Sequence, residues 1–145
     1  MGEELRALAR FVGELRLETV PDDVVRAARL CVLDTLGSAL GATRSREIRA
    51  ITAELEDWSG VGKNHRLASA WGQGTRTSLN NAVLVNGMLS HELELDDVHT
   101  ASKSHVGAVV VPAAWTVADA MDAYMKEKAG KEKNEKDGKG LADRE

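Results

Sequence analysis

Between Leu30 and Leu40 the chain is apolar or small at almost every position, and this run constrains the fold more than any other feature. A helix on a protein surface has one polar side, whereas a helix that is apolar on all sides is surrounded by other helices. The run follows Pro21 and two aspartates, which favour the start of a helix. We therefore expect a helix from Pro21 to about Gly41 that is buried among others.

Helical periodicity continues on both sides of this run. Apolar residues recur at three- and four-residue steps over residues 5–15, and the segment "REIRAITAELEDW" predicts a third helix that ends before Ser59. Residues 59–77 contain four glycines and predict a loop or a short extended segment, in which Gly72 and Gly74 serve backbone turns.

Two more helices are predicted in the second half of the chain. Ser78 can cap a fourth helix that reaches about Glu92. A fifth is expected from near Gly107 to about Lys128, with Pro112 in its first turn or at a kink. Because no alternating strand pattern of useful length occurs, the predicted fold class is all-α, a multi-helix bundle.

The C-terminal segment has a different composition. The last twenty residues hold seven basic residues, six acidic residues and one large apolar side chain, Leu141. So few apolar groups cannot offset the entropy of ordering the segment. We expect one helical domain over residues 1–128 and a charged, flexible tail over residues 129–145.

Composition also bounds the partners and the compartment. The formal net charge of −4 provides no basic field for nucleic acid or an anionic membrane, so neither is expected as a partner. Cys31 is the single cysteine, which excludes an intrachain disulfide framework, and we expect it to be a small buried hydrophobe. The N-terminal segment lacks the apolar stretch of a secretory signal, and no run reaches the roughly 18 apolar residues of a membrane span. We expect a cytoplasmic protein.

The segment "SHELELDDVHTASKSHVG" places acids and imidazoles directly before an apolar run. Crowded acids raise one another's pKa, and a group whose pKa lies near the working pH can take a proton from an activated carbon. Asp96, Asp97 and His105 are the catalytic candidates. Gly107 opens a predicted helix whose free N–H groups can hold a substrate carboxylate, and Lys103 adds a positive charge for an acidic substrate.

Other interpretations of these residues stay open. Acids after a helix are commonly a solvated turn, and His91 can simply end the fourth helix. A metal site of His91, Asp96 and His99 is a further alternative, but the spacings match no firm ligand motif, so no metal is expected. His65 is expected on the surface.

Three blocks of the sequence resemble, in the same order, blocks of the MmgE/PrpD family. They are "LARFVGELRLETVPDDVVRAARLCVLDTLGSALGA", "WGQGTRTSLNNAVLVNGMLSHELELDDVH" and "SHVGAVVVPAAWTVADA", and together they span residues 5 to about 123. The family includes 2-methylcitrate dehydratase, cis-aconitate decarboxylase and iminodisuccinate epimerase. The chain is similar only to the first part of the family's helical domain, which suggests a truncated or split enzyme.

The resemblance implies chemistry on a small polycarboxylate. A proton is removed next to a carboxyl or carbonyl group, and the substrate then loses water, loses carbon dioxide or changes configuration. The resemblance implies that no cofactor is needed, neither a metal nor an iron–sulfur cluster. It also implies a homo-oligomer, typically a homodimer, or a complementary chain that supplies the missing part.

The resemblance assigns roles by position. Asp96 and Asp97 match the paired acids of the family's "DD" motif, and His105 matches the histidine that opens its "HPG" or "HPS" turn. The substrate-binding candidates are Glu94, His99, Lys103 and Gly107. Val98 and Val106 depart from the usual threonine and proline.

The sequence therefore supports two functional hypotheses from different classes. The first is a lyase or isomerase of the MmgE/PrpD type, a 2-methylcitrate dehydratase-like hydro-lyase above all. The second is a non-catalytic helical remnant or oligomerisation module. The two differ in whether a second chain or segment completes the site.

Overall fold

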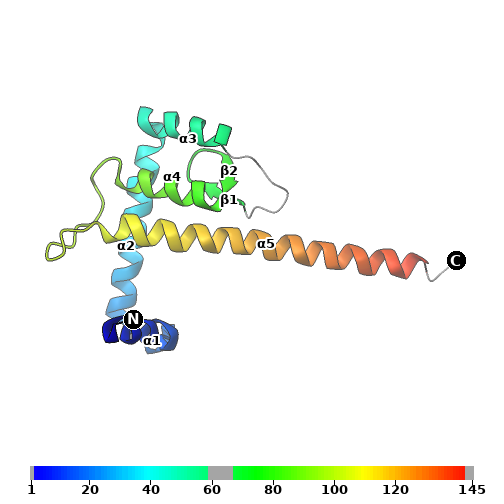
Figure 1. The fold of residues 1–145 in the computed structure, drawn as a ribbon, viewed down its shortest axis with the longest axis horizontal. Coiled ribbons are helices and arrows are strands. Elements are labelled where there is room, and N and C mark those ends of the chain that lie inside the picture. The colour runs from blue at the N-terminus through cyan, green and yellow to red at the C-terminus, as the bar shows by residue number, and fades with distance from the viewer. Residues whose placement is uncertain (1, 59–66, 143–145) are drawn as a thin grey trace.

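The computed structural model describes residues 2–58 and 67–142, with side chains described over residues 2–55 and 67–131. The all-α class is confirmed, because helices dominate the described residues and are accompanied there by one two-stranded sheet (Figure 1). The α-helices are α1 Glu3–Glu14, α2 Asp22–Gly41, α3 Arg46–Trp58, α4 Leu79–His91 and α5 Val106–Ala142. Short 3₁₀ turns cover Leu17–Thr19 and Ala42–Arg44.

Helices α4 and α5 form the centre of the molecule. They lie side by side, α2 crosses both, and α3 packs on α4 (Figure 1). The buried residues between them are mostly small, and the largest apolar ones are Ile48, Val85 and Leu89. Small side chains let helix backbones approach closely, and a Cβ added at Gly87 of α4 would lie only 3.6 Å from the Ala108 carbonyl oxygen of α5.

A β-hairpin stands where the sequence predicted a loop or a short extended segment. Strands β1 Leu67–Ala70 and β2 Thr75–Ser78 pair antiparallel, with Leu67 opposite Ser78. Of the two alternatives, the short extended segment is therefore the one found over residues 67–78. Gly72 and Gly74 have positive φ angles of 66° and 70°, which confirms that they serve the turn.

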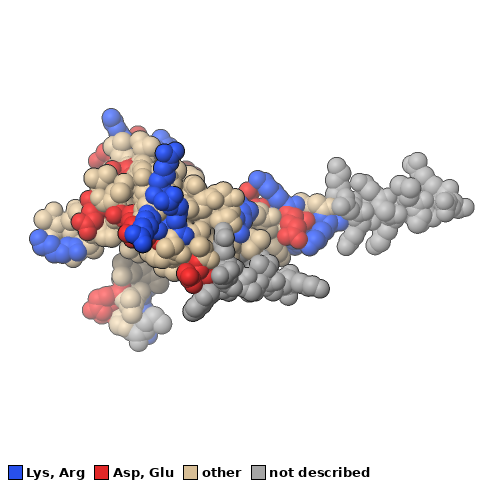
Figure 2. Space-filling model, turned by 90° about the horizontal axis from the view of Figure 1, so that it is seen from above, with Lys and Arg blue, Asp and Glu red and all other residues tan. Residues whose placement is uncertain are grey.

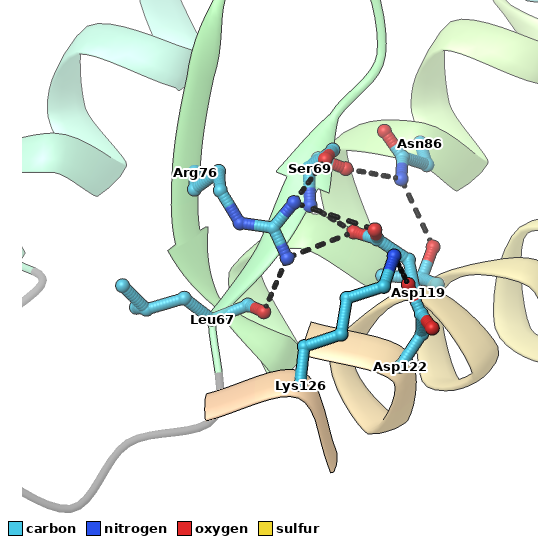
Figure 3. A network of polar contacts seen from close by, with 8 residues as sticks. Leu67, Ser69, Arg76, Asn86, Asp119, Asp122 and Lys126 are labelled. Carbon is cyan, nitrogen blue, oxygen red and sulfur yellow. Dashed lines mark hydrogen bonds and ion pairs between the residues drawn. The ribbon is translucent and has the colours of Figure 1, made fainter. Parts of the chain in front are cut away.

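Asn86 of α4 holds the hairpin against the helices (Figure 3). Its side chain is fully buried and makes three hydrogen bonds. Its Oδ1 accepts from the Trp71 N–H at 2.8 Å, and its Nδ2 donates to the Ser69 carbonyl at 3.0 Å and to Thr116 Oγ1 at 2.9 Å. One amide thus connects α4, β1 and α5.

An ion pair between Asp119 and Arg76 lies beside this amide (Figure 3). Asp119 of α5 accepts from the Ser69 N–H at 2.7 Å and forms an ion pair with Arg76 at 3.2 Å. Partial burial raises the pKa of Asp119, but the hydrogen bonds from Ser69 and Arg76 and the charge of Arg76 outweigh burial and lower the pKa overall. The ionised carboxylate is therefore the form that secures the hairpin to α5.

Helix α5 is longer than the sequence predicted. It continues to Ala142 instead of ending near Lys128, and it extends away from the other elements (Figure 1). Pairs of opposite charge at four-residue spacing stabilise a helix by a few tenths of a kcal/mol each, and Lys126 with Asp122 and Lys131 with Glu127 are such pairs. The predicted helix end is wrong, and the flexibility of the charged tail over residues 129–145 stays a prediction.

Pro112 lies inside α5 rather than in its first turn. Proline has no N–H, so it cannot donate to the carbonyl four residues earlier, that of Ala108. The position is buried against the neighbouring elements. The alternative that Pro112 occupies the first turn is therefore wrong.

Helix α2 is covered on one side only within the described part of the chain. Its buried residues are Thr35, Ser38 and Ala39. Leu30, Leu33 and Leu40 are 58%, 66% and 59% exposed. The expectation of a fully surrounded helix is wrong for this chain by itself, because the described elements pack against one face of α2. Cys31, expected to be buried, is exposed for the same reason.

Basic and acidic side chains lie next to one another on the face seen from above (Figure 2).

Among the described helices, the part of α5 over Val106–Lys131 is long and apolar enough to cross a membrane by length and composition alone, with a mean hydropathy of 1.3. This is weak evidence for a span, because a core helix of a soluble protein has the same composition.

Candidate active site

The candidate site lies where the linker from α4 to α5 folds back between the two helices. His91 is the last residue of α4, and His105 directly precedes α5. Asp96 lies between them in the sequence, and its side chain has no exposed surface. The linker begins with a turn in which Glu94 has a φ of 50°. The Glu94 N–H donates to the His91 carbonyl at 2.9 Å.

Asp96 joins two imidazoles. Its Oδ1 lies 3.0 Å from His91 Nδ1, and its Oδ2 lies 3.1 Å from His105 Nδ1. The rings of His91 and His105 are 4.5 Å apart between centroids and meet edge to face at 65°. A buried charge needs such hydrogen-bonding partners, so the three side chains form one unit.

Asp96 and Asp97 have different hydrogen-bond partners. Asp97 turns toward α5, where its Oδ1 accepts from the Gly107 N–H at 2.8 Å. This bond satisfies one of the first N–H groups of the helix, as an N-terminal capping side chain does. The Gly107 N–H is therefore engaged by Asp97, and the role of this helix start in holding a substrate carboxylate stays a prediction.

Gly107 is needed for this contact. A Cβ at this position would lie 2.1 Å from Asp97 Oδ1 and 2.6 Å from Thr35 Oγ1, closer than real atoms approach. The missing side chain thus lets Asp97 reach the start of α5 and lets α5 pack on α2. Its role here is close packing.

The other substrate-binding candidates lie along the linker. His99 is exposed, and its Nδ1 accepts from the Ser102 N–H at 3.3 Å. Lys103 is exposed with a φ of 54°, and Glu94 is exposed as well. Among the contacts described, none joins these three side chains to the unit of His91, Asp96 and His105. His65 lies outside the described residues.

A groove opens beside the two imidazoles. It has a volume of about 540 Å³ and is lined by His91, Ser104 and His105 together with apolar residues of α4 and α5. Leu84 and Val109 are two of these apolar residues. A small molecule in this groove would meet an apolar wall and two ring nitrogens.

The same unit contains the atoms that a metal ion would need. One ligand atom from each of His91, Asp96 and His105 lies within 4.8 Å of the others. The sequence considered His99 in place of His105, and the structure places His99 with Ser102 instead. The contact between His91 and Asp96 was not predicted from the sequence, because a spacing of five residues across a helix end is no recognised motif.

Comparisons with known proteins match most of the chain. The MmgE/PrpD N-terminal domain model matches residues 6–133. The cis-aconitate decarboxylase-like protein oryM of Aspergillus oryzae is 26% identical over 118 residues, which covers 81% of this chain and 24% of that protein. The chain thus spans about a quarter of the length of this curated relative.

Proposed function

Because the chain belongs to the MmgE/PrpD family, we propose that it forms one wall of the active site of a lyase or isomerase that acts on a small di- or tricarboxylate. The observation that carries this proposal is the buried Asp96 carboxylate on His105, at the edge of a groove. A carboxylate that holds an imidazole fixes its orientation and tautomer, as general-base catalysis requires.

In the proposed reaction His105 removes a proton from the carbon next to a substrate carboxyl group. The carbon–hydrogen electron pair then forms a double bond as hydroxide leaves and takes up a proton, which gives a dehydration. Return of the proton to the other face would give an epimerisation. Asp96 acts as a positioning residue, and the charge of Asp97 contributes to the field at the start of α5.

The proposal includes a cytoplasmic location and no cofactor, with dehydration of a 2-methylcitrate-like substrate as its leading form. The decarboxylase-like name of the relative from Aspergillus oryzae supports a polycarboxylate substrate class. The small groove and its two imidazoles fit a ligand that carries both an apolar part and an acidic group.

Citrate binding tests this assignment. We expect citrate to shift the ring signals of His105 in nuclear magnetic resonance spectra and to leave those of His99 nearly unchanged, because His105 lines the groove and His99 does not. His105→Gln should weaken citrate binding at least tenfold, whereas His99→Gln serves as the matched control. Equal loss of citrate binding in both variants would contradict the assignment.

A second candidate function is a non-catalytic helical module that associates with another chain or with a second copy. The observation in its favour is the exposed apolar surface of α1 and α2, where no residue of α1 is buried. Phe11 is 61% exposed and Leu33 is 66% exposed. Exposed apolar patches of this kind mark interaction surfaces.

We expect residues 1–145 to self-associate at micromolar concentration and to bind a hydrophobic dye. Leu33→Glu should lower the associated fraction in light scattering, because it places a charge on the exposed apolar face of α2. Arg26→Glu places the same side chain at a polar position of that helix and is the control. A dilute, stable monomer that binds no dye would exclude the module.

A further inference from the structure

His91 stands in the same relation to Asp96 as His105 does. We propose that His91 is a second acid–base group of the site, held by Asp96 as one of a matched pair of imidazoles. The inference rests on the proposed function and concerns the same groove. It assigns an acid–base role to a residue that the sequence analysis considered as the end of a helix or as a metal ligand.

The hydrogen bonds define the state of both rings. The Nδ1 of His91 lies 3.0 Å from Asp96 Oδ1 and 3.3 Å from Oδ2, and the Nδ1 of His105 lies 3.1 Å from Oδ2. A carboxylate accepts hydrogen bonds and has no hydrogen to donate, so both Nδ1 atoms carry the proton. In a neutral ring the lone pair is then on Nε2, which can accept a proton, whereas in a protonated ring Nε2 carries a proton that it can donate.

The placement of the rings makes both available to one ligand. They line the same groove, and their side chains are 47% and 34% exposed. The ring centroids are 4.5 Å apart. A small substrate in the groove can therefore reach both rings, whereas Asp96 below them has no exposed surface and acts through them.

Two imidazoles supply the two proton transfers of an elimination. Neutral His105 accepts the proton from the substrate carbon at Nε2, the carbon–hydrogen pair forms the double bond, and the carbon–oxygen bond breaks. Protonated His91 gives its Nε2 proton to the departing hydroxide, which leaves as water. His105 ends protonated and His91 neutral, and proton exchange with solvent restores the starting state.

A metal ion would use the same three side chains in a different way. An ion held by Asp96 and by the ring nitrogens next to it would need the Nδ1 lone pairs of His91 and His105, whereas here both Nδ1 atoms lie at hydrogen-bonding distance from Asp96. Every buried side-chain polar atom described has a hydrogen-bond partner, which favours the hydrogen-bonded pair. Stoichiometric binding of a metal ion would therefore contradict the inference.

Ring nitrogen resonances of the 145-residue chain decide between these states. We expect His91 and His105 to show the Nδ1–H tautomer and His99 the opposite, Nε2–H tautomer, because His99 Nδ1 accepts from the Ser102 N–H. Asp96→Asn should reduce the Nδ1–H population of both paired rings and leave His99 unchanged. Asp97→Asn, which alters the neighbouring acid, should leave all three unchanged.

Two results would overturn the inference. The first is an Nε2–H tautomer at His91 in the unsubstituted chain. This measurement does not depend on whether a variant folds. The second is stoichiometric binding of zinc ion that shifts both rings and is lost in Asp96→Asn. A citrate titration separates this inference from the proposed function: no citrate binding contradicts the function, whereas shifts at His105 without shifts at His91 contradict the second acid–base group.

Discussion

Residues 1–145 alone are expected to show no useful turnover of 2-methylcitrate, citrate or cis-aconitate. The chain spans 24% of the length of its curated relative, so His91, Asp96 and His105 provide one wall of the proposed site. Loss of the opposing groups also removes substrate positioning, which contributes roughly 7 kcal/mol or more to lowering a barrier. The measurement is a dehydration assay that follows the ultraviolet absorbance of the conjugated product.

A chain that supplies the remainder of the family sequence should restore turnover when mixed with this one. In the restored enzyme, His105→Ala should abolish activity because it removes the proposed base. Asp97→Asn should also abolish activity. This variant keeps an oxygen that can accept from the Gly107 N–H, so a loss of activity would show that the negative charge of Asp97 is needed. Turnover by the lone chain that disappears in either variant would mean that these few residues form a complete site.

Asn86→Leu is expected to cause the largest loss of stability among single substitutions at described positions. The change keeps a branched side chain of four heavy atoms but leaves the Trp71 N–H, the Ser69 carbonyl and the Thr116 hydroxyl without the partner that Asn86 provides. Buried groups that lose their partners cost about 1–3 kcal/mol each, so the free energy of unfolding should fall by about 3 kcal/mol or more. Urea denaturation followed by far-ultraviolet circular dichroism measures this change.

Asn80→Leu provides the matched control for this experiment. Asn80 lies on the same helix and is exposed, so the same substitution should change the unfolding free energy by no more than about 0.5 kcal/mol. If the two variants unfold at the same urea concentration, Asn86 does not connect the hairpin to the helices in the way described.

The helices could be predicted because their signals are local. The Ser78 side chain accepts from the Asn81 N–H at the start of α4, as its position in the sequence predicted. The hairpin could not be predicted in this way, because "LASA" and "TRTS" have little apolar alternation. Its strands are secured by Asn86 and Asp119, which come from helices later in the chain.

The candidate site was predictable in part. The sequence identified Asp96 and His105, and the structure joins them. It could not show that Asp97 turns to the start of α5 or that His91 completes the unit, since both depend on the path of the linker. That path includes left-handed backbone at Glu94 and Lys103, which neither residue type favours and which no spacing rule reveals.

The hydrogen bonds of the candidate site span short distances along the chain. Asp96 reaches His91 and His105 across five and nine residues, and Asp97 reaches Gly107 across ten. Contacts so close in sequence form quickly, because little chain entropy is lost in closing the loop. During synthesis on the ribosome, this wall can therefore assemble as soon as α4 and the start of α5 have emerged, before any later segment is available to pack against it.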